Sequence, residues 1–224
     1  MNELTVRECL SVGWRTFKIR PWFFVSAWVL LTLVGFIANA AGKHIHAPHA
    51  ASWTLVVAIA VIAVFFRLLG FVVSIYADIG MRSFALKAHD EPEAVELDDL
   101  IHLHTFWRYL GMNILFIVGV VIGFILLIVP GIILAIGWSF APYLVIEQGA
   151  GPVDALKRSW ELTKGNRWTL FLLGLALIGI NILGFCAVFV GLLVTLPVTT
   201  FAGVHAYRTL LKARTEPVEG MGVL

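Results

Sequence analysis

The segment VDALKRSWELTKGNRWTLF, residues 153–171, lies between two long apolar stretches and decides how the chain folds. If residues 152–164 form a helix, Val153, Leu156 and Trp160 share one face and charged side chains occupy the other. A helix of this kind lies in the plane of a membrane surface, with its tryptophan at the depth of the lipid headgroups. The segment therefore predicts a surface helix between two membrane spans.

The composition places the whole chain in a membrane. Of the 224 residues, 60% are hydrophobic and 13% are charged, and the mean hydropathy is +0.93. A soluble globular domain carries about 25% charged residues, so this chain has too few charges to cover a soluble surface. The net charge of +2 is too small to indicate a nucleic-acid-binding protein.

Several apolar stretches approach the length of about 20 residues that a helix needs to cross a bilayer. The predicted spans are residues 22–41, 53–77, 109–129, 131–146, 168–187 and 189–207. A tight turn at Val129-Pro130-Gly131 is expected to join the third span to the fourth. Glycines between Leu183 and Gly191 mark the expected turn between the fifth span and the sixth.

The basic residues indicate how these spans are oriented, because cytoplasmic loops of membrane proteins are enriched in Lys and Arg. All of the 16 Lys and Arg residues except Lys43 and Arg67 lie in segments that six spans would place on one side. We therefore expect six spans with both termini in the cytoplasm. Cys9 and Cys186 then lie on opposite sides of the membrane, so no disulfide is expected between them.

The surface helix at residues 152–164 has two counterparts earlier in the chain. Residues 5–19 carry an apolar stripe at helical spacing, and the more acidic residues 95–107 also end next to a span. We therefore predict an all-α polytopic membrane protein, with residues 1–224 as a single domain. Its three two-span hairpins would each follow a cytoplasmic amphipathic surface helix. Either duplication or a shared amphipathic constraint explains the similarity of the three units.

The second half of the chain resembles a known family. The segments LLIVPGIILAIGWSFAPYLVIEQGAGPVDALKRSWELTKG and GLLVTLPVTTFAGVHAYRTL resemble bacterial six-span proteins similar to the membrane domain joined to some glycerophosphoryl diester phosphodiesterases. The matching features are Pro130-Gly131, Pro142, Glu147, Gly149, Gly151, Ala155, Ser159-Trp160, Gly165, Gly191, Pro197 and Tyr207-Arg208. The resemblance implies a location in the bacterial plasma (inner) membrane, and it transfers no catalytic residue.

Arg67 interrupts the second predicted span and is the most informative single residue. A charge near the middle of a bilayer costs on the order of 3 kcal/mol, so we expect Arg67 to face the bundle interior and to have partners there. Counting helical rise from the cytoplasmic side places Ser139, Asn181, Thr199 and Thr200 at similar depth. This candidate polar layer is interpreted either as a structural clamp or as the site of a substrate or ion.

Candidate contacts to lipid headgroups come from the surface helices. Basic side chains beside the cytoplasmic face attract anionic headgroups by about 1 kcal/mol each, and tryptophan anchors such helices at headgroup depth. The candidate residues are Trp14, Lys18, Lys157, Arg158, Trp160 and Arg167.

No metal or cofactor is expected. Three histidines lie within residues 44–49, but no cysteine or carboxylate joins them in the loop, so a solvated loop is the preferred interpretation over a zinc site. Glu147, at the end of the fourth predicted span, is expected to cap the following loop or to pair with Arg158 or Lys157.

The sequence contains no recognisable Ser-His-Asp set, paired intramembrane carboxylates or phosphate loop. We therefore expect an integral membrane protein that is not an enzyme and that interacts with lipid or with a partner. The alternative is a small transporter or channel built around the polar layer, and an intramembrane lipid enzyme is the least favoured class. The expected partners are membrane lipids, with either a second copy of the chain or another membrane protein, and no nucleic acid.

Overall fold

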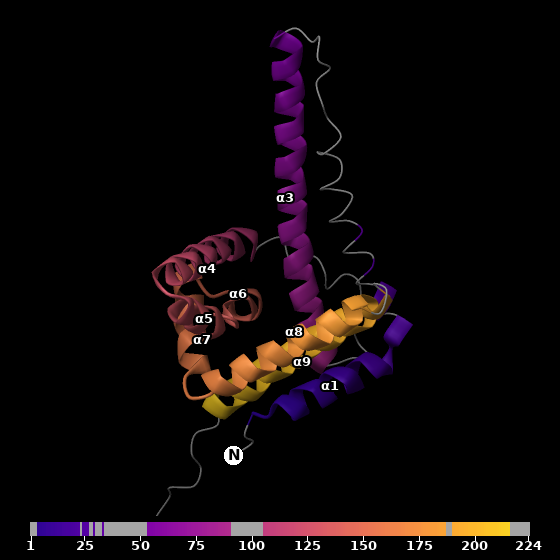
Figure 1. The fold of residues 1–224 in the computed structure, drawn as a ribbon, viewed down its shortest axis with the longest axis vertical. Coiled ribbons are helices and arrows are strands. Elements are labelled where there is room, and N and C mark those ends of the chain that lie inside the picture. Colours follow the sequence, from indigo (N-terminus) through magenta and orange to yellow (C-terminus); the bar gives the residue numbers. More distant parts are fainter. Residues whose placement is uncertain are drawn as a thin grey trace, which may run out of the picture.

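The computed structural model describes residues 4–22, 24–26, 29, 33, 53–90, 105–186 and 190–215, and every secondary-structure element in these ranges is an α-helix (Figure 1). The helices are α1 (Val6–Ile19), α3 (Trp53–Asp90), α4 (Phe106–Leu126), α5 (Ile128–Gly137), α6 (Ala141–Gln148), α7 (Pro152–Thr163), α8 (Arg167–Cys186) and α9 (Val190–Thr215). The all-α class predicted from the sequence is confirmed for this part of the chain.

Among the described residues, four helical stretches are long and apolar enough to cross a membrane. They are Val57–Asp90, Phe106–Leu126, Ile128–Gln148 and Arg167–Cys186. These stretches overlap the second to fifth predicted spans, whereas α9, which overlaps the sixth, is not among them. The first predicted span, the acidic helix at residues 95–107 and the histidines of residues 44–49 lie largely or wholly outside the described residues. The six-span layout therefore stays a prediction.

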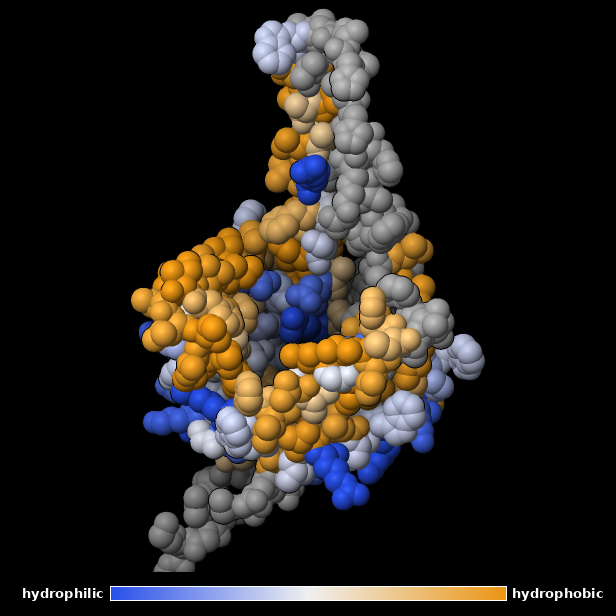
Figure 2. Space-filling view, viewed as in Figure 1, coloured by the Kyte–Doolittle hydropathy of each residue, from blue (hydrophilic) through white to orange (hydrophobic). Residues whose placement is uncertain are grey.

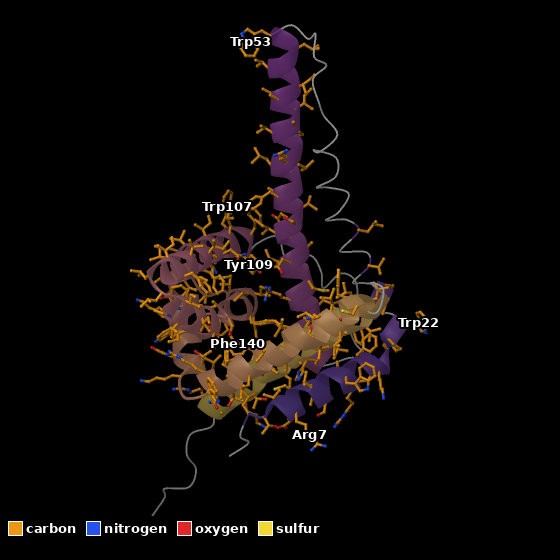
Figure 3. The ribbon with its side chains drawn as sticks, in the orientation of Figure 1. Arg7, Trp22, Trp53, Trp107, Tyr109 and Phe140 are labelled. Atoms are coloured by element: carbon orange, nitrogen blue, oxygen red, sulfur yellow. The ribbon has the colours of Figure 1, made fainter. Side chains whose placement is uncertain are left out.

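Helix α3 extends past the expected end of the second span, at residue 77, and ends at Asp90 (Figure 1). Its 38 residues give a length of about 57 Å, nearly twice the hydrocarbon thickness of about 30 Å. Its first half stands away from the other helices (Figure 1), and Trp53 at its tip is 81% exposed (Figure 3). Its second half enters the protein core, where Ile79 and Phe84 are fully buried.

The turn after α4 occurs earlier than the sequence indicated. Leu127, rather than Val129-Pro130-Gly131, breaks the helix with an extended backbone of φ −165° and ψ 149°. Pro130 lies in the first turn of α5, where its missing N–H removes no helical hydrogen bond. Gly131 lets the two helices approach closely, because a Cβ there would lie 2.6 Å from the ring of Phe124.

The predicted fourth span is not one uninterrupted helix. The chain leaves α5 after Gly137 and starts α6 at Ala141, with Pro142 near the start of the new helix. Pro142 has no N–H to donate, which favours a break at this point. Ser159 of α7 satisfies the freed backbone: its Oγ donates to the Gly137 carbonyl at 2.8 Å and accepts the Phe140 N–H at 3.2 Å.

The predicted helix at residues 5–19 forms as α1 and packs along α9. Cys9, Gly13 and Phe17 are buried in this contact, whereas Trp14 is 45% exposed. A Cβ on Gly13 would lie 2.6 Å from the Val198 carbonyl oxygen, so the two backbones meet at this glycine. The apolar stripe of α1 is therefore used largely for packing within the protein.

The core lies at one end of the long helices. The ring of Phe24 meets those of Phe84 and Phe201 edge-on, at centroid distances of 5.8 and 4.9 Å, and Tyr143 stacks on Tyr207 at 5.3 Å. The distant parts of α3, α4 and α8 instead expose many large aliphatic side chains, which form broad apolar faces in Figure 2. Soluble monomers rarely expose apolar patches of this extent, so these faces favour insertion in a membrane.

Candidate functional site

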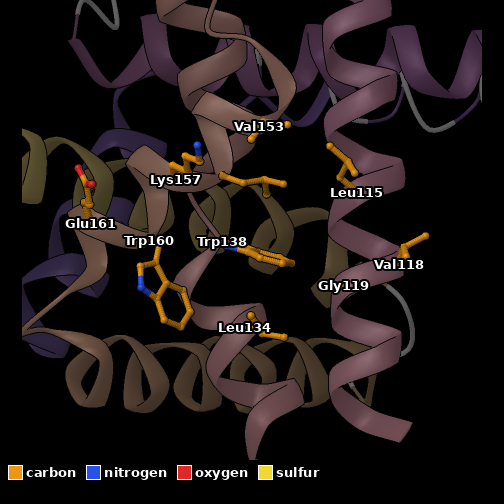
Figure 4. A pocket seen from close by; sticks show the side chains of 10 residues that line it. Leu115, Val118, Gly119, Leu134, Trp138, Val153, Lys157, Trp160 and Glu161 are labelled. Atoms are coloured by element: carbon orange, nitrogen blue, oxygen red, sulfur yellow. The ribbon is translucent and has the colours of Figure 1, made fainter. Parts of the chain in front are cut away.

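An open apolar groove of about 560 Å³ lies between α4, α5 and α7 (Figure 4). One wall comes from Leu115, Val118 and Gly119 of α4. The opposite wall comes from Leu134 of α5, from Trp138 just after it, and from the apolar face of α7 with Val153, Leu156 and Trp160. The segment that predicted a surface helix therefore forms one wall of this groove.

Two glycines give this groove its shape. Trp138 projects toward Gly119 of α4 (Figure 4), and a Cβ on Gly119 would lie 2.3 Å from its ring. Gly137 bears the same relation to Trp160, with a distance of 2.3 Å from the Cβ position to the ring. Each tryptophan ring thus occupies the space that a side chain at the facing glycine would fill. The spacing of apolar residues along a helix does not predict such a contact.

Charged side chains lie beside this apolar wall. Lys157 and Glu161, one helical turn apart on α7, line the groove, and both are exposed. The Arg167 guanidinium carbon lies 3.6 Å from the centroid of the Trp160 ring, a cation–π contact. Among the described residues no acceptor pairs with the buried Nε and Nη2 of Arg167. The tryptophan wall therefore carries basic groups suited to an anion.

The predicted headgroup contacts separate into two groups. On α7, Lys157 and Trp160 line the groove, and Arg167 of α8, which does not line it, stacks on the ring of Trp160. On α1, the Lys18 ammonium lies 5.2 Å from the ring centroid of Trp14. The sixth candidate, Arg158, is exposed and donates to Gln148 Oε1 at 3.1 Å.

The structure does not bring together the polar layer expected around Arg67. This residue lies on the exposed part of α3, about 12 Å of helix before buried Ile75, and within the described ranges no hydrogen bond or ion pair joins it to another side chain. Asn181 Nδ2 instead donates to Thr199 Oγ1 at 3.4 Å. The layer is incomplete because α3 diverges from the other helices before it reaches the depth of Arg67.

The other two members of the expected layer satisfy their own helices. Ser139 Oγ donates to the Ile136 carbonyl at 2.8 Å, and Thr200 Oγ1 donates to the Leu196 carbonyl at 2.9 Å. Back-bonding of this kind leaves neither hydroxyl hydrogen available to a partner on another helix.

Glu147 pairs with α9 rather than with Arg158 or Lys157, which corrects the expectation from the sequence. Its carboxylate accepts a hydrogen bond from Tyr207 at 2.7 Å and forms an ion pair with Arg208. Arg208 also bridges to Asp90 at the end of α3, through Nε at 3.1 Å and a second contact from Nη2. The pKa of Arg208 is raised: partial burial opposes its charge, but Glu147 and Asp90 outweigh this by stabilising the charged form.

This network continues to two histidines. His89 Nδ1 lies 3.2 Å from Asp90 Oδ1, and its Nε2 lies 3.0 Å from His205 Nδ1. The ends of α3, α6 and α9 are therefore joined by one chain of polar contacts. Sequence reasoning missed it, although Glu147 and Tyr207-Arg208 were among the features that carried the family resemblance.

A second polar cluster ties α3 to α4. Asp78 accepts a hydrogen bond from Tyr109, and Arg82 Nε lies 3.3 Å from each Asp78 carboxylate oxygen. Arg82 also faces the ring of Tyr143, at 5.5 Å from its centroid. The spacing of Asp78 and Arg82 on one helical face was the available signal for their pairing. Within the described ranges no group of three or more His, Cys, Asp or Glu side chains could hold a metal ion.

The groove lies within the part of the chain that matches a protein-family model. Residues 109–214, which contain every residue that lines the groove, match the model of a family described as "Protein of unknown function (DUF975)". No solved structure matches the chain.

Uncharacterized proteins of Mycobacterium bovis and Mycobacterium tuberculosis are 28% identical to this chain over 116 residues, which make up 49% of this chain and 36% of theirs. The matched region thus spans about a third of the length of these curated relatives. These matches give no support to the resemblance to the membrane domain of glycerophosphoryl diester phosphodiesterases. The second half of the chain is therefore similar to a family whose function is unknown.

Proposed function

We propose that this protein is a non-enzymatic integral membrane protein that contacts lipid headgroups through the exposed side of α7. The observation that carries this proposal is the position of Lys157 and Arg167 around Trp160, beside a groove walled by two candidate membrane-spanning stretches. Tryptophan with Lys or Arg on an interfacial helix is the usual combination at headgroup depth.

The proposed layout has six spans with both termini in the cytoplasm of a bacterium, in its plasma (inner) membrane. The distribution of Lys and Arg supports this orientation. α1, with exposed Trp14 and Lys18, would meet the same membrane surface as α7. The proposed partners are membrane lipids and either a second copy of the chain or another membrane protein, and not a nucleic acid.

Lipid selectivity of the reconstituted protein tests the headgroup contact. Spin-labelled phosphatidylglycerol and phosphatidylcholine report how strongly the protein prefers an anionic headgroup. Replacing Lys157 with Gln should reduce this preference about fivefold, the factor that corresponds to one basic contact. Asp154→Asn, on the exposed side of the same helix, is the matched control and should leave the preference unchanged or increase it. Equal selectivity in wild type and Lys157→Gln would contradict the proposal.

The proposed orientation is tested separately. A single Cys placed at His46 should react with an impermeant maleimide in intact cells, because this residue belongs to the expected outer loop. A Cys placed at exposed Arg158 should react only after the membrane is opened. Reaction of the Arg158 position in sealed cells would overturn the orientation.

A further inference from the structure

We propose that the groove between α4, α5 and α7 holds one acyl chain of a glycerophospholipid whose phosphate is bound by Lys157 and Arg167. This inference rests on the proposed function, because it assigns the ligand of the same surface. It goes further by separating a seated lipid from the lipids that merely surround the protein.

The groove has the depth and lining that an acyl chain requires. α4 begins at Phe106, so Leu115 lies about 14 Å and Gly119 about 20 Å along the helix from that end. The α4 wall of the groove therefore lies within a candidate membrane span, at a depth that lipid chains occupy. Its walls are almost wholly aliphatic or aromatic, and its volume of about 560 Å³ lies within the ordinary range of ligand sites.

The two tryptophans give the groove rigid walls. Trp138 and Trp160 rest on Gly119 and Gly137, so their rings are held in place by backbone that cannot accept a side chain. An acyl chain beside these rings would contact rigid apolar walls on both sides. A seated chain should consequently exchange more slowly than the lipids around the exposed faces of α3 and α8.

The charges at the groove select the headgroup end of the ligand. Lys157 lines the groove. Arg167 stacks on Trp160 of the groove wall, and two of its buried N–H groups lack partners in the described structure. Glu161, also in the lining, disfavours a ligand that is anionic along its whole length, such as an acidic peptide. A single phosphate joined to an apolar chain satisfies both requirements.

A photoreactive lipid tests the proposal with the full-length protein. The probe is a phosphatidylglycerol with a diazirine in one acyl chain, added at low fraction to nanodiscs that contain the protein. After irradiation, peptide mass spectrometry should find adducts concentrated on residues 115–119 and on Trp138. Equal labelling of these residues and of the exposed face of α8, with Leu175 and Ile178, would overturn the proposal.

A groove-filling variant gives the decisive comparison. Val118 lines the groove and is 49% exposed, whereas Val121 on the same helix is 48% exposed and does not line it. Val118→Trp should lower the Trp138 adducts at least fivefold, and Val121→Trp should leave them unchanged. Equal adducts in the two variants would refute the groove site. If Lys157→Gln still lowered headgroup selectivity in that case, the proposed function would stand and only the seated lipid would be lost.

Discussion

Tyr207 donates its hydroxyl hydrogen to Glu147 across 2.7 Å and so joins α9 to the end of α6. The Tyr207 ring is fully buried and stacks on Tyr143, while the same carboxylate pairs with Arg208. Arg208 in turn reaches Asp90, so three helices that are distant in the sequence are held at one point. This contact therefore lies at the junction of the helical core.

Replacing Tyr207 with Phe tests the strength of this junction. The ring packing is retained, but Glu147 loses one hydrogen-bond donor, and a bond to a charged group contributes about 1.5–3 kcal/mol. We expect the free energy of unfolding in mild detergent to fall by about that amount. Tyr76→Phe is the control, because Tyr76 stacks on Phe106 at 4.9 Å and its hydroxyl has no partner among the described residues. An equal effect in both variants would contradict the assignment.

The contact of α1 with α9 depends on the absence of a side chain at Gly13. A methyl group there would lie 2.6 Å from the Val198 carbonyl oxygen and 3.0 Å from the Ala202 nitrogen, and neither backbone atom can move cheaply. Gly13→Ala should therefore destabilise the protein by about 1–3 kcal/mol, although alanine is the better helix former.

The matched control for this change is Gly174→Ala in α8. A Cβ at Gly174 would meet no atom within 4 Å, so the substitution should have no effect or should stabilise the helix by up to about 1 kcal/mol. Thermal unfolding followed by circular dichroism distinguishes the two variants. A stable Gly13→Ala protein would show that α1 does not pack on α9 as described.

Local patterns predicted most helices of this fold because they depend on residues three or four positions apart. The helix predicted at residues 152–164 forms as Pro152–Thr163, and the one predicted at 5–19 forms as Val6–Ile19. The break between α5 and α6 escaped prediction because Ser159, which satisfies it, lies 22 residues after Gly137.

The sequence predicted fewer of the residues in the candidate sites than of the helices. Composition and periodicity identified Lys157 and Trp160, but the groove also needs Gly119 of α4 to accept Trp138, and no local pattern links those two residues. The pairing of Arg208 with Asp90 spans 118 positions. Arg67 was expected to face the bundle interior because a charge in the bilayer is unfavourable in free energy. Instead, α3 diverges from the other helices, and Arg67 is exposed.

Cys9 should be almost inert in the folded protein. Its side chain is fully buried, and burial, aided by the nearby charge of Glu8, raises the pKa of the thiol to about 11. Because only the thiolate reacts, alkylation near pH 7.5 should be on the order of 100-fold slower than for a free cysteine. The rate should keep rising with pH up to about 11, whereas that of a free thiol levels off above a pH of about 8.5.

Mass spectrometry after brief iodoacetamide treatment measures this rate. Cys186, which is exposed at the end of α8, serves as the internal comparison within the same molecule. Rapid alkylation of Cys9 in folded protein at neutral pH would mean that α1 does not remain packed on α9. For the same reason a topology experiment needs an introduced cysteine rather than Cys9.

Ser159 holds the break between α5 and α6 beside the groove, so its replacement by Ala should affect both stability and the groove. The variant leaves the buried Phe140 N–H without its acceptor and removes a donor from the Gly137 carbonyl. Thr163 Oγ1 lies 3.3 Å from that carbonyl, but its single hydrogen is shared with the Trp160 carbonyl at 3.2 Å. Leaving a buried polar group unpaired costs about 1–3 kcal/mol, so unfolding should become easier by that amount.

The backbone at Gly137 also supports the ring of Trp160, so Ser159→Ala should reduce photoreactive-lipid adducts on Trp138 as well as stability. Ser139→Ala is the control, because Ser139 only donates to the Ile136 carbonyl of the preceding turn; its effect on stability should stay within about 0.5 kcal/mol. Unchanged stability in Ser159→Ala would show that α7 does not hold the break between α5 and α6. Lower stability with unchanged adducts would show instead that the groove keeps its shape without this hydrogen bond.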